Sequence, residues 1–433
     1  MEYVKKLTTK YETDVLIAGG GPAGIAAGIA AARDGKRVLL IEQYGCLGGM
    51  GTTGMVPEFM CFDDGIHLLA GGIGGEVKKA LFGDEIAYKC YNAAVEDVKR
   101  LYDCMVTESG VKLLLFTKLV DVVTENKKIQ YAIVSSCSGM YAIKAKVFVD
   151  CTGDGELSVQ AGAAYEFGDE EGTTMPATLC SFWSGIDFDR KTKPDGYKVG
   201  DAYMRGVLSQ LDLCLPGIKM VDKSSGVGGG NVGHAYAVND LEEEALTAAM
   251  LQSREIVAEY VRYYREYVPG CEKANLCYTA PVLGVRESRR IVCDYMMHHT
   301  DYIKRACFDD EIGRYNYPVD IHPKSPDIQS IEQFAKDTAL KYENGESYGI
   351  SLRSLIVKGL DNLFVAGKCV GASREMQASM RVMPCCFITG QAAGIAASVT
   401  AETLCNSHAV PIAEVQKRLW KMGAYLPNYQ PEA

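Results

Sequence analysis

Basic side chains are in the minority in this chain of 433 residues. The sequence has 45 lysines and arginines against 55 aspartates and glutamates, which gives a formal net charge of −10. A protein that holds phosphate backbones needs a basic face. The excess of acid therefore argues against a nucleic-acid partner.

Long apolar runs are also missing. Residues 1–14 contain lysines but no apolar stretch of the kind that forms the centre of a signal peptide. No segment approaches the roughly 18 continuous apolar residues that a membrane helix needs. We therefore expect a cytoplasmic protein without a membrane span.

Cysteine is abundant, with 16 residues, but no two cysteines have the C-x-x-C spacing. This excludes the usual ligand pattern of zinc ribbons, thioredoxin-type dithiols and ferredoxin-type clusters, so we predict no metal site. Disulfide scaffolds belong to short secreted chains. We expect buried free thiols that pack as small hydrophobic side chains. The adjacent Cys385 and Cys386 could form a redox dithiol, although packing is the favoured interpretation.

The first 42 residues contain a complete βαβ unit. DVLIA at residues 14–18 is typical of a buried parallel strand, and it is followed by the turn GGGPAG. Small residues at helical spacing then extend to Gly35. A second strand, KRVLLIE, ends at Glu42.

The glycines of this turn have distinct physical roles. Gly19 permits the tight turn, Gly21 lets a pyrophosphate approach the backbone, and Gly24 lets helix and strand pack closely. The helix N-terminus offers N–H groups to that pyrophosphate. Glu42 is placed to accept hydrogen bonds from an adenosine ribose. The pattern predicts a dinucleotide site without deciding which dinucleotide binds.

The rest of the chain suggests a discontinuous domain with an insertion. Residues 111–151 alternate β-branched runs with turns, which predicts a meander that returns to a buried strand. A long helix follows, with a capping box formed by Asp240 and Glu243. A last strand at residues 362–367 precedes a helix that starts near Gly390. We expect no internal repeat.

The motifs resemble the glutathione-reductase-like FAD fold. The resemblance rests on GGGPAG, Glu42, the second glycine-rich loop GGMGTTG, TGDG at residues 152–155 and NLFVAG. APVLGVRESRRI, PVDIH and GKCVGASREMQASMRVMPCCFITGQAAG are similar to the broad family of bacterial FAD-dependent oxidoreductases. That family is distantly similar to fumarate reductase and succinate dehydrogenase flavoproteins. The resemblance covers roughly residues 12–425.

The resemblance implies an α/β fold, with a Rossmann-type FAD-binding domain, a β-meander and an inserted α+β substrate or cap domain. The FAD-binding domain would comprise residues 12–165 and 345–405. The insertion would comprise residues 166–344, and residues 406–433 would form a C-terminal helix and tail. With one dinucleotide fingerprint in the chain, no dedicated nicotinamide domain is expected.

The resemblance also implies which residues contact FAD. Residues from both ends of the chain would contact the pyrophosphate, the ribose and the flavin. The backbone of Val120 would contact adenine, and the helix start at Gly390 would lie near the pyrimidine edge of the flavin. The implied residues are Gly19, Gly21, Pro22, Ala23, Gly24, Glu42, Gln43, Gly48, Gly49, Met50, Thr52, Val120, Thr152, Gly153, Asp154, Gly367, Met383, Gly390, Gln391 and Ala392.

Two departures from the wider superfamily bear on the cofactor. Lys368 stands where many of its members have an acid after the last strand. No histidine lies between Gln43 and Thr53, which removes the obvious residue for a histidyl-linked flavin. Cys46 could form a thioether, but we expect noncovalent FAD.

Four residues are candidates for catalysis. His234 and His322 lie in the inserted half, and either could act as a general acid or base because imidazole titrates near neutral pH. Arg286 and Arg381 could stabilise a reduced flavin or bind a substrate carboxylate.

The most consistent function is an FAD-dependent oxidoreductase, either a dehydrogenase or a reductase, that acts on a small organic substrate by hydride transfer to or from flavin N5. The alternative is a flavin-bearing electron-transfer subunit of a larger complex, which the absence of iron–sulfur spacing disfavours. A flavin–folate transferase acting on tRNA is disfavoured by the acidic charge. A homo-oligomer is possible. The substrate, the direction of reaction and the electron donor or acceptor are not determined by the sequence.

Overall fold

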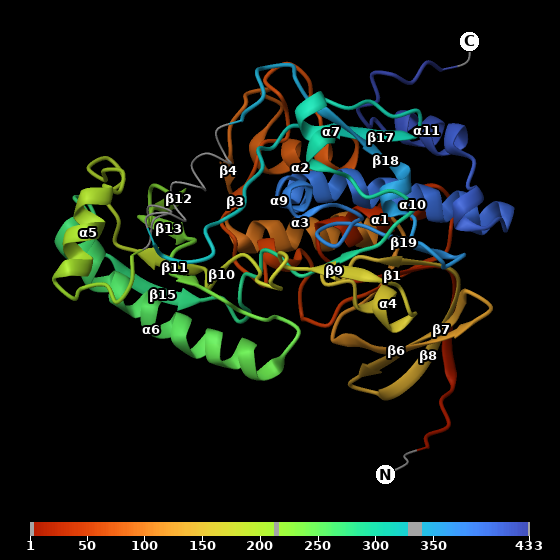
Figure 1. The fold of residues 1–433 in the computed structure, drawn as a ribbon, viewed down its shortest axis with the longest axis horizontal. Coiled ribbons are helices and arrows are strands. Elements are labelled where there is room, and N and C mark those ends of the chain that lie inside the picture. Colours follow the sequence, from red (N-terminus) through yellow and green to blue (C-terminus); the bar gives the residue numbers. More distant parts are fainter. Residues whose placement is uncertain (1–3, 212–215, 328–339, 432–433) are drawn as a thin grey trace.

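A computed structural model describes residues 4–211, 216–327 and 340–431. Its main sheet is built around β1 (Thr9–Ala18), which pairs in parallel with β2 (Val38–Ile41) and β8 (Gly139–Asp150) (Figure 1). β5 (Lys112–Leu114) extends the sheet beyond β2, and β19 (Leu363–Val365) pairs in parallel with the end of β8. Together with α1 (Pro22–Arg33), these strands confirm the predicted βαβ unit, although β1 begins five residues earlier than expected.

The predicted meander is present. β6 (Thr117–Glu125) pairs antiparallel with β7 (Lys128–Ser136), which in turn pairs antiparallel with the first half of β8. The second half of β8 continues between β1 and β19. One long strand therefore joins the meander to the nucleotide-binding sheet.

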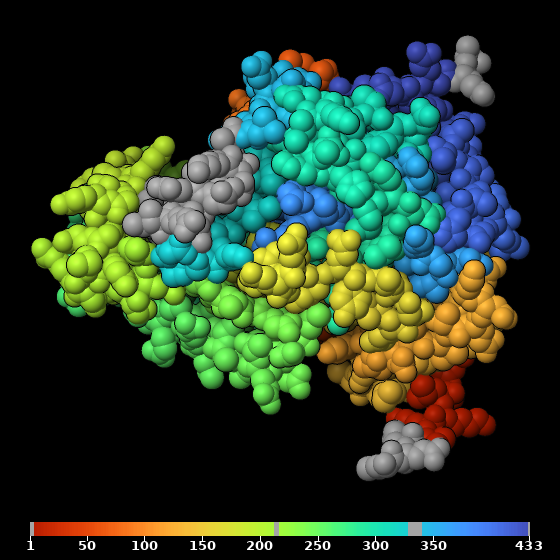
Figure 2. Space-filling view, in the orientation of Figure 1, coloured from red at the N-terminus to blue at the C-terminus, as the bar shows by residue number. Residues whose placement is uncertain are grey.

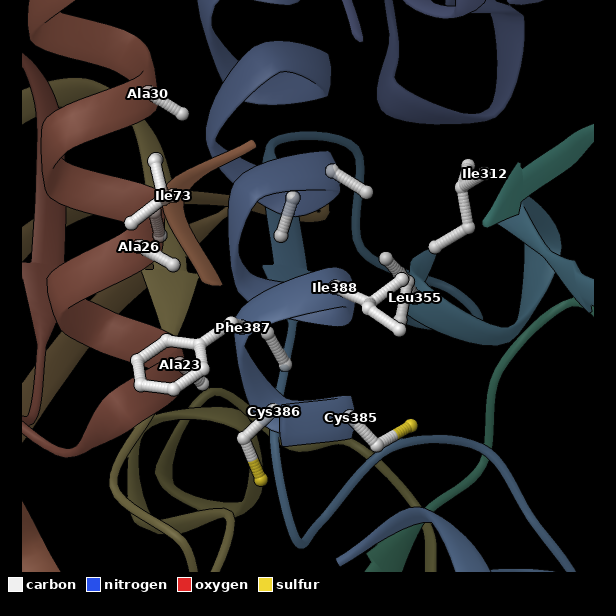
Figure 3. Close-up of a cluster of buried hydrophobic side chains, with 14 of the residues drawn as sticks. Ala23, Ala26, Ala30, Ile73, Ile312, Leu355, Cys385, Cys386, Phe387 and Ile388 are labelled. Atoms are coloured by element: carbon white, nitrogen blue, oxygen red, sulfur yellow. The ribbon is translucent and has the colours of Figure 1, made fainter. Parts of the chain in front are cut away.

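Helix α10 (Met383–Thr403) packs directly on α1 in the main core (Figure 3). A Cβ atom on Gly390 would lie 2.2 Å from the carbonyl oxygen of Ala23, and one on Gly394 would lie 2.3 Å from that of Ala27. The predicted helix start near Gly390 is wrong, because α10 begins seven residues earlier and Gly390 lies in its middle. Its small residues serve close helix packing.

The length and composition of α10 would allow it to cross a membrane, but 94% of its most apolar window is buried inside the protein. On its two sides α10 contacts α1 and the strand β17 (Glu311–Tyr315). Helix α10 is therefore the central core helix of this fold.

A second hydrophobic core lies in a lobe formed between residues 177 and 283, at the left of Figures 1 and 2. The lobe holds a four-stranded antiparallel sheet and two helices. The strand order is β12 (Ile218–Asp222), β13 (Val227–Gly230), β11 (Ser181–Ser184) and β15 (Asn275–Thr279), and the helices are α5 (Gly196–Met204) and α6 (Glu243–Tyr267). Buried side chains of the predicted insertion such as Met297, Ile312 and Tyr342, and tail residues such as Leu419, belong instead to the main core with α1. The predicted limits of the insertion and of the tail therefore differ from the distribution of buried side chains.

The elements of the lobe are β10 (Ala177–Thr178), β11 (Ser181–Ser184), α5 (Gly196–Met204), β12 (Ile218–Asp222), β13 (Val227–Gly230), β14 (His234–Ala235), α6 (Glu243–Tyr267) and β15 (Asn275–Thr279). The remaining elements are β3 (Glu58–Phe59), α2 (Ile73–Phe82), β4 (Tyr91–Asn92), α3 (Val95–Glu108), α4 (Glu156–Gln160), β9 (Tyr165–Phe167), β16 (Arg289–Ile291), α7 (His299–Lys304), β18 (Tyr348–Ser351), α9 (Arg374–Met380) and α11 (Ile412–Lys421).

The predicted capping box of the long helix is wrong. Helix α6 begins at Glu243 with Glu242 as its N-cap residue, and no side chain caps it. Asp240 instead lies in the wall of the cavity described below. The helix ends at Tyr267, just before Pro269, as the sequence indicates.

Fifteen of the sixteen cysteines lie in the described part of the chain, and all fifteen are free thiols; Cys214 lies outside the described residues. Cys385 and Cys386 are both buried in the first turn of α10, and their sulfur atoms point away from each other (Figure 3). Burial raises the pKa of both thiols. This geometry supports packing over a dithiol.

We expect a Gly→Ala substitution to change stability in opposite directions at two helical positions. Gly394 lies in the contact between α1 and α10, whereas Gly200 lies outside it. Gly394→Ala places a methyl group against the backbone of Ala27, so we expect a loss of about 1–3 kcal/mol from overpacking. Gly200→Ala in α5 meets no described atom within 4 Å and should stabilise the protein by about 0.5–1 kcal/mol. Urea unfolding midpoints measure both. Equal midpoints for the two variants would contradict the tight contact.

Candidate functional site

A cavity of about 520 Å³ lies at the carboxyl ends of the parallel strands. Residues that end or directly follow these strands, among them Ala18, Ile41, Cys151 and Ala366, form part of its wall. The first turn of α1 and residues of the lobe complete it. In open α/β sheets, ligands bind at this edge, where the strand order reverses.

Most of the residues implied to contact FAD line this cavity. Thirteen do so: Gly19, Gly21, Pro22, Ala23, Glu42, Gln43, Gly49, Met50, Thr152, Gly153, Asp154, Gly367 and Met383. They come from both ends of the chain. The fold thus brings the predicted cofactor residues into one wall.

Seven of the implied residues lie elsewhere. Gly24 is held against Gly19, whose carbonyl oxygen would be 1.8 Å from an added Cβ, so it serves the close packing of turn and helix. Gly48 adopts a left-handed conformation (φ 109°), and the hydroxyl of Thr52 donates to the carbonyl of Leu47 at 2.5 Å. These residues shape the glycine-rich loop behind the wall.

Val120 lines a separate cavity of about 340 Å³ together with Lys118, Glu156 and Arg289. The expectation that residues 390–392 lie at a helix N-terminus is corrected by the position of α10. Gly390, Gln391 and Ala392 are buried in the interior of that helix, and Gln391 accepts a hydrogen bond from the backbone of Ile73 at 3.2 Å.

Gly21 supplies the space that a pyrophosphate requires. It is the N-cap residue of α1, with an ordinary extended conformation (φ −69°, ψ 179°). An added Cβ would meet no described protein atom within 4 Å. The fold therefore does not itself require glycine at this position, whereas a ligand in close contact with the helix N-terminus would. The residues present fit a dinucleotide here.

Glu42 connects the second strand to two turns. Its carboxylate is almost fully buried and accepts hydrogen bonds from the backbone N–H groups of Gly20 (2.7 Å) and Tyr44 (2.8 Å). Burial raises the pKa of Glu42, while these backbone donors act in the opposite direction. The carboxylate holds the glycine-rich turn and lies in the cavity wall, where a ribose hydroxyl could also donate to it.

Lys368, which stands in place of the expected acid, forms an ion pair with Asp154 at 2.8 Å. Burial alone would lower the pKa of Lys368, but the charges of Asp154 and Asp240 raise it above the ordinary value. All three side chains line the cavity. The centre of the wall therefore carries a charged ammonium group.

The four catalytic candidates lie together at the end of the cavity. His234 Nε2 lies 3.2 Å from His322 Nδ1, and His322 Nε2 lies 3.4 Å from Asp320 Oδ2. Arg381 donates to the carbonyl oxygen (2.9 Å) and the carboxylate (3.1 Å) of Asp320. His322 and Arg381 line the cavity, while His234 is buried behind His322.

Arg286 lies in the same wall and donates to three neutral oxygen atoms. These belong to Pro176 (2.9 Å), Thr178 (2.6 Å) and Asn231 (3.0 Å). The charge of Arg286 also acts on the cluster, because it lowers the pKa values of Asp320 and His322. The guanidinium is thus fixed in place by the lobe.

Asp320 is the residue that the sequence interpretation missed. Burial raises its pKa, but His322, Arg381 and Arg286 together hold it well below the usual range, so the carboxylate stays ionised. Tyr317 donates to the same carboxylate at 3.4 Å and also lines the cavity. Its signal in the sequence is the acid two residues before the histidine in PVDIH.

His322 is neutral at physiological pH. Burial and the charge of Arg286 lower its pKa to about 3, although Asp320 acts in the opposite direction. A neutral imidazole in the cavity wall can accept a proton, and the ionised Asp320 beside it would stabilise the cation formed. Within the described residues, no group of three or more His, Cys, Asp or Glu side chains could hold a metal ion.

Comparison with known families matches residues 14–419 to one described as FAD dependent oxidoreductase. The chain belongs to this family. The match confirms the resemblance noted in the sequence and spans nearly all of the residues that carried it. FAD is therefore the dinucleotide that the glycine-rich turn and Glu42 are expected to hold.

Individual relatives are distant. The chain is 25% identical to the thiamine thiazole synthase of Aeropyrum pernix over 167 residues, which cover 35% of this chain and 58% of the relative. The same enzyme of Pyrococcus furiosus is 25% identical over 171 residues, with 36% and 64% covered. The chain thus spans about 60% of the length of these curated relatives.

Solved structures are also similar over most of the chain. A geranylgeranyl bacteriochlorophyll reductase-like protein of Thermoplasma acidophilum has a TM-score of 0.48 at 12% identity, covering 95% of this chain and 83% of that one. The p-nitrophenol 4-monooxygenase of Pseudomonas putida has a TM-score of 0.45 at 12% identity, covering 95% and 84%.

The lowered pKa of His322 predicts a measurable acid sensitivity. The unfolded chain binds the proton more readily than the folded protein, so stability should fall as the pH drops below about 6.5. Between pH 7.5 and pH 5, the wild type should lose about 2 kcal/mol more unfolding free energy than His322→Gln. Urea unfolding at both pH values measures this, and the pH 7.5 comparison controls for other effects of the substitution. Parallel losses would show that His322 titrates normally.

Proposed function

We propose that the protein is an oxidoreductase that exchanges hydride between noncovalently bound FAD and a small organic substrate. The observation that supports this most directly is the continuity of one cavity. Its wall extends from the first turn of α1 to His322 and Arg381. A cofactor site and a group of ionisable side chains therefore share one cavity.

In this proposal the first turn of α1 holds the pyrophosphate, Glu42 holds the adenosine ribose, and the loop containing Gly49 and Met50 supports the flavin. When bound, FAD supplies the hydride chemistry. Noncovalent binding is supported by the position of Cys46, which is outside the cavity wall. Its sulfur lies 3.3 Å from the hydroxyl of Thr53.

His322 is the proposed proton carrier. The imidazole of His322 takes the proton that leaves the substrate, and its Nδ1 atom lies 3.2 Å from His234 Nε2. Asp320 lies beside Nε2 at 3.4 Å and would stabilise the imidazolium formed. His234 and Arg381 then act on the reaction by positioning His322 and Asp320.

We favour this function over an electron-transfer subunit because the cavity has the size and the polar groups of a small-molecule site. Copurification of a stable partner chain would support the alternative. We also propose a cytoplasmic location and a homo-oligomer, which cell fractionation and size-exclusion chromatography test. Screening of electron donors and acceptors identifies the redox partner.

The cofactor assignment predicts that acid-precipitated protein releases FAD into the supernatant. Gly21→Val should lose this flavin, and its apoprotein should keep the urea unfolding midpoint of wild-type apoprotein, because a Cβ atom at this position meets no described protein atom within 4 Å and the side chain would occupy ligand space. Gly24→Val is the contrasting variant, since its side chain meets the backbone of Gly19 and should lose both flavin and stability. Release of FMN or NAD from wild-type protein would refute the proposal, and flavin in the pellet would indicate a covalent link.

The proton-carrier assignment predicts unequal effects of two substitutions. In flavin-loaded protein, His322→Ala should slow single-turnover bleaching of the flavin about 10²–10⁴-fold, with whichever substrate a spectral screen identifies. His234→Ala should have a smaller effect, because His234 is outside the cavity wall. Flavin content, measured in each variant, controls for loss of cofactor. If both variants stay within about threefold of the wild-type rate, neither histidine carries the proton.

A further inference from the structure

One guanidinium nitrogen of Arg381 has no hydrogen-bond partner among the described residues, although the other side chains of its cluster are hydrogen-bonded to one another. Its side chain is 8% exposed, and its Nη2 atom makes both hydrogen bonds to Asp320. Its Nη1 atom is fully buried and has no hydrogen-bond partner among residues 4–211, 216–327 and 340–431. Leaving a charged donor buried without a partner is costly. Other atoms of the residue line the cavity, so a small rotation of the guanidinium would let a bound molecule supply the missing acceptor.

The charge around Arg381 favours an anionic acceptor. Arg286 and Arg381 bring two positive charges to this end of the cavity, and Asp320 brings one negative charge. The positive charge of Arg286 is one of the causes that lower the pKa of His322. The same Asp320 carboxylate would repel a doubly charged phosphate. One further negative charge, as on a carboxylate, suits this arrangement.

The lobe side of the cavity is mainly apolar. Leu246, Met250, Val282 and Leu283 contribute to the wall there. A molecule that fills both regions would combine a charged group with an apolar body.

We propose that the substrate is a monocarboxylate with an apolar body, and that Arg381 binds its carboxylate through Nη1 beside His322. This inference rests on the proposed function, because it concerns the substrate half of the same cavity. Arg381 would then have two tasks: Nη2 fixes Asp320, and Nη1 orients the substrate toward His322.

Binding of simple probes to the FAD-loaded protein tests this directly. Benzoate and hexanoate are titrated against their neutral counterparts benzamide and hexanamide, with the change in flavin absorption and calorimetry as readouts. We expect the carboxylates to bind at least tenfold more tightly than the amides. Arg381→Met should weaken carboxylate binding about 10- to 100-fold and leave amide binding within about threefold. Arg381→Lys should recover part of the loss, since it keeps the charge.

Arg353→Met is the matched control, because Arg353 pairs with Asp310 and is outside the cavity wall. It should bind benzoate as the wild type does. Equal affinity for acid and amide in wild-type protein, or unchanged benzoate binding in Arg381→Met, would overturn the inference. So would loss of FAD from Arg381→Met with undiminished benzoate affinity in the loaded fraction, since Arg381 would then contact the cofactor. Absence of FAD from wild-type protein would instead refute the proposed function.

Discussion

The close packing of α10 on α1 is the contact on which the cavity depends. Gly390 and Gly394 let the backbone of α10 approach Ala23 and Ala27 to a distance that no side chain would permit. Because the two helices are held together along their length, their N-terminal turns face the same cavity. Any residue larger than glycine at this contact would separate the glycine-rich turn from Met383 and its neighbours.

A second constraint joins the body to the lobe. His234 is on β14 in the lobe, while His322, Asp320 and Arg381 belong to segments that pack with the main core. Of these residues, His322, Asp320 and Arg381 line the cavity. Burial strengthens each hydrogen bond in this cluster and also raises the cost of a buried polar atom without a partner. The Nη1 atom of Arg381 therefore points to a ligand group that would bind it.

Local patterns of the sequence predicted local structure well. The βαβ unit, the meander and the end of α6 were found because strand alternation, glycine turns and Pro269 act within a few residues. The start of α10 was missed, although Pro384 is typical of a first helical turn. The capping box was wrong because Asp240 faces the cavity, where tertiary contacts replace its capping role. Gly390 to Ala392 were assigned to a ligand, whereas Gly390 serves close helix packing and Gln391 accepts a hydrogen bond from the backbone of Ile73.

The sequence by itself determined the nucleotide-binding half of this protein. The turn GGGPAG, Glu42 and the following loop are close in the chain, so their chemistry can be inferred from spacing alone. The substrate half was decided only by tertiary structure. His234 and His322 are 88 residues apart, and Arg381 is 61 residues from Asp320. No local pattern relates such distant residues, since His234 comes from the lobe and the other three come from segments that pack with the main core. The lowered pKa of His322 follows first from burial, which only the complete fold creates.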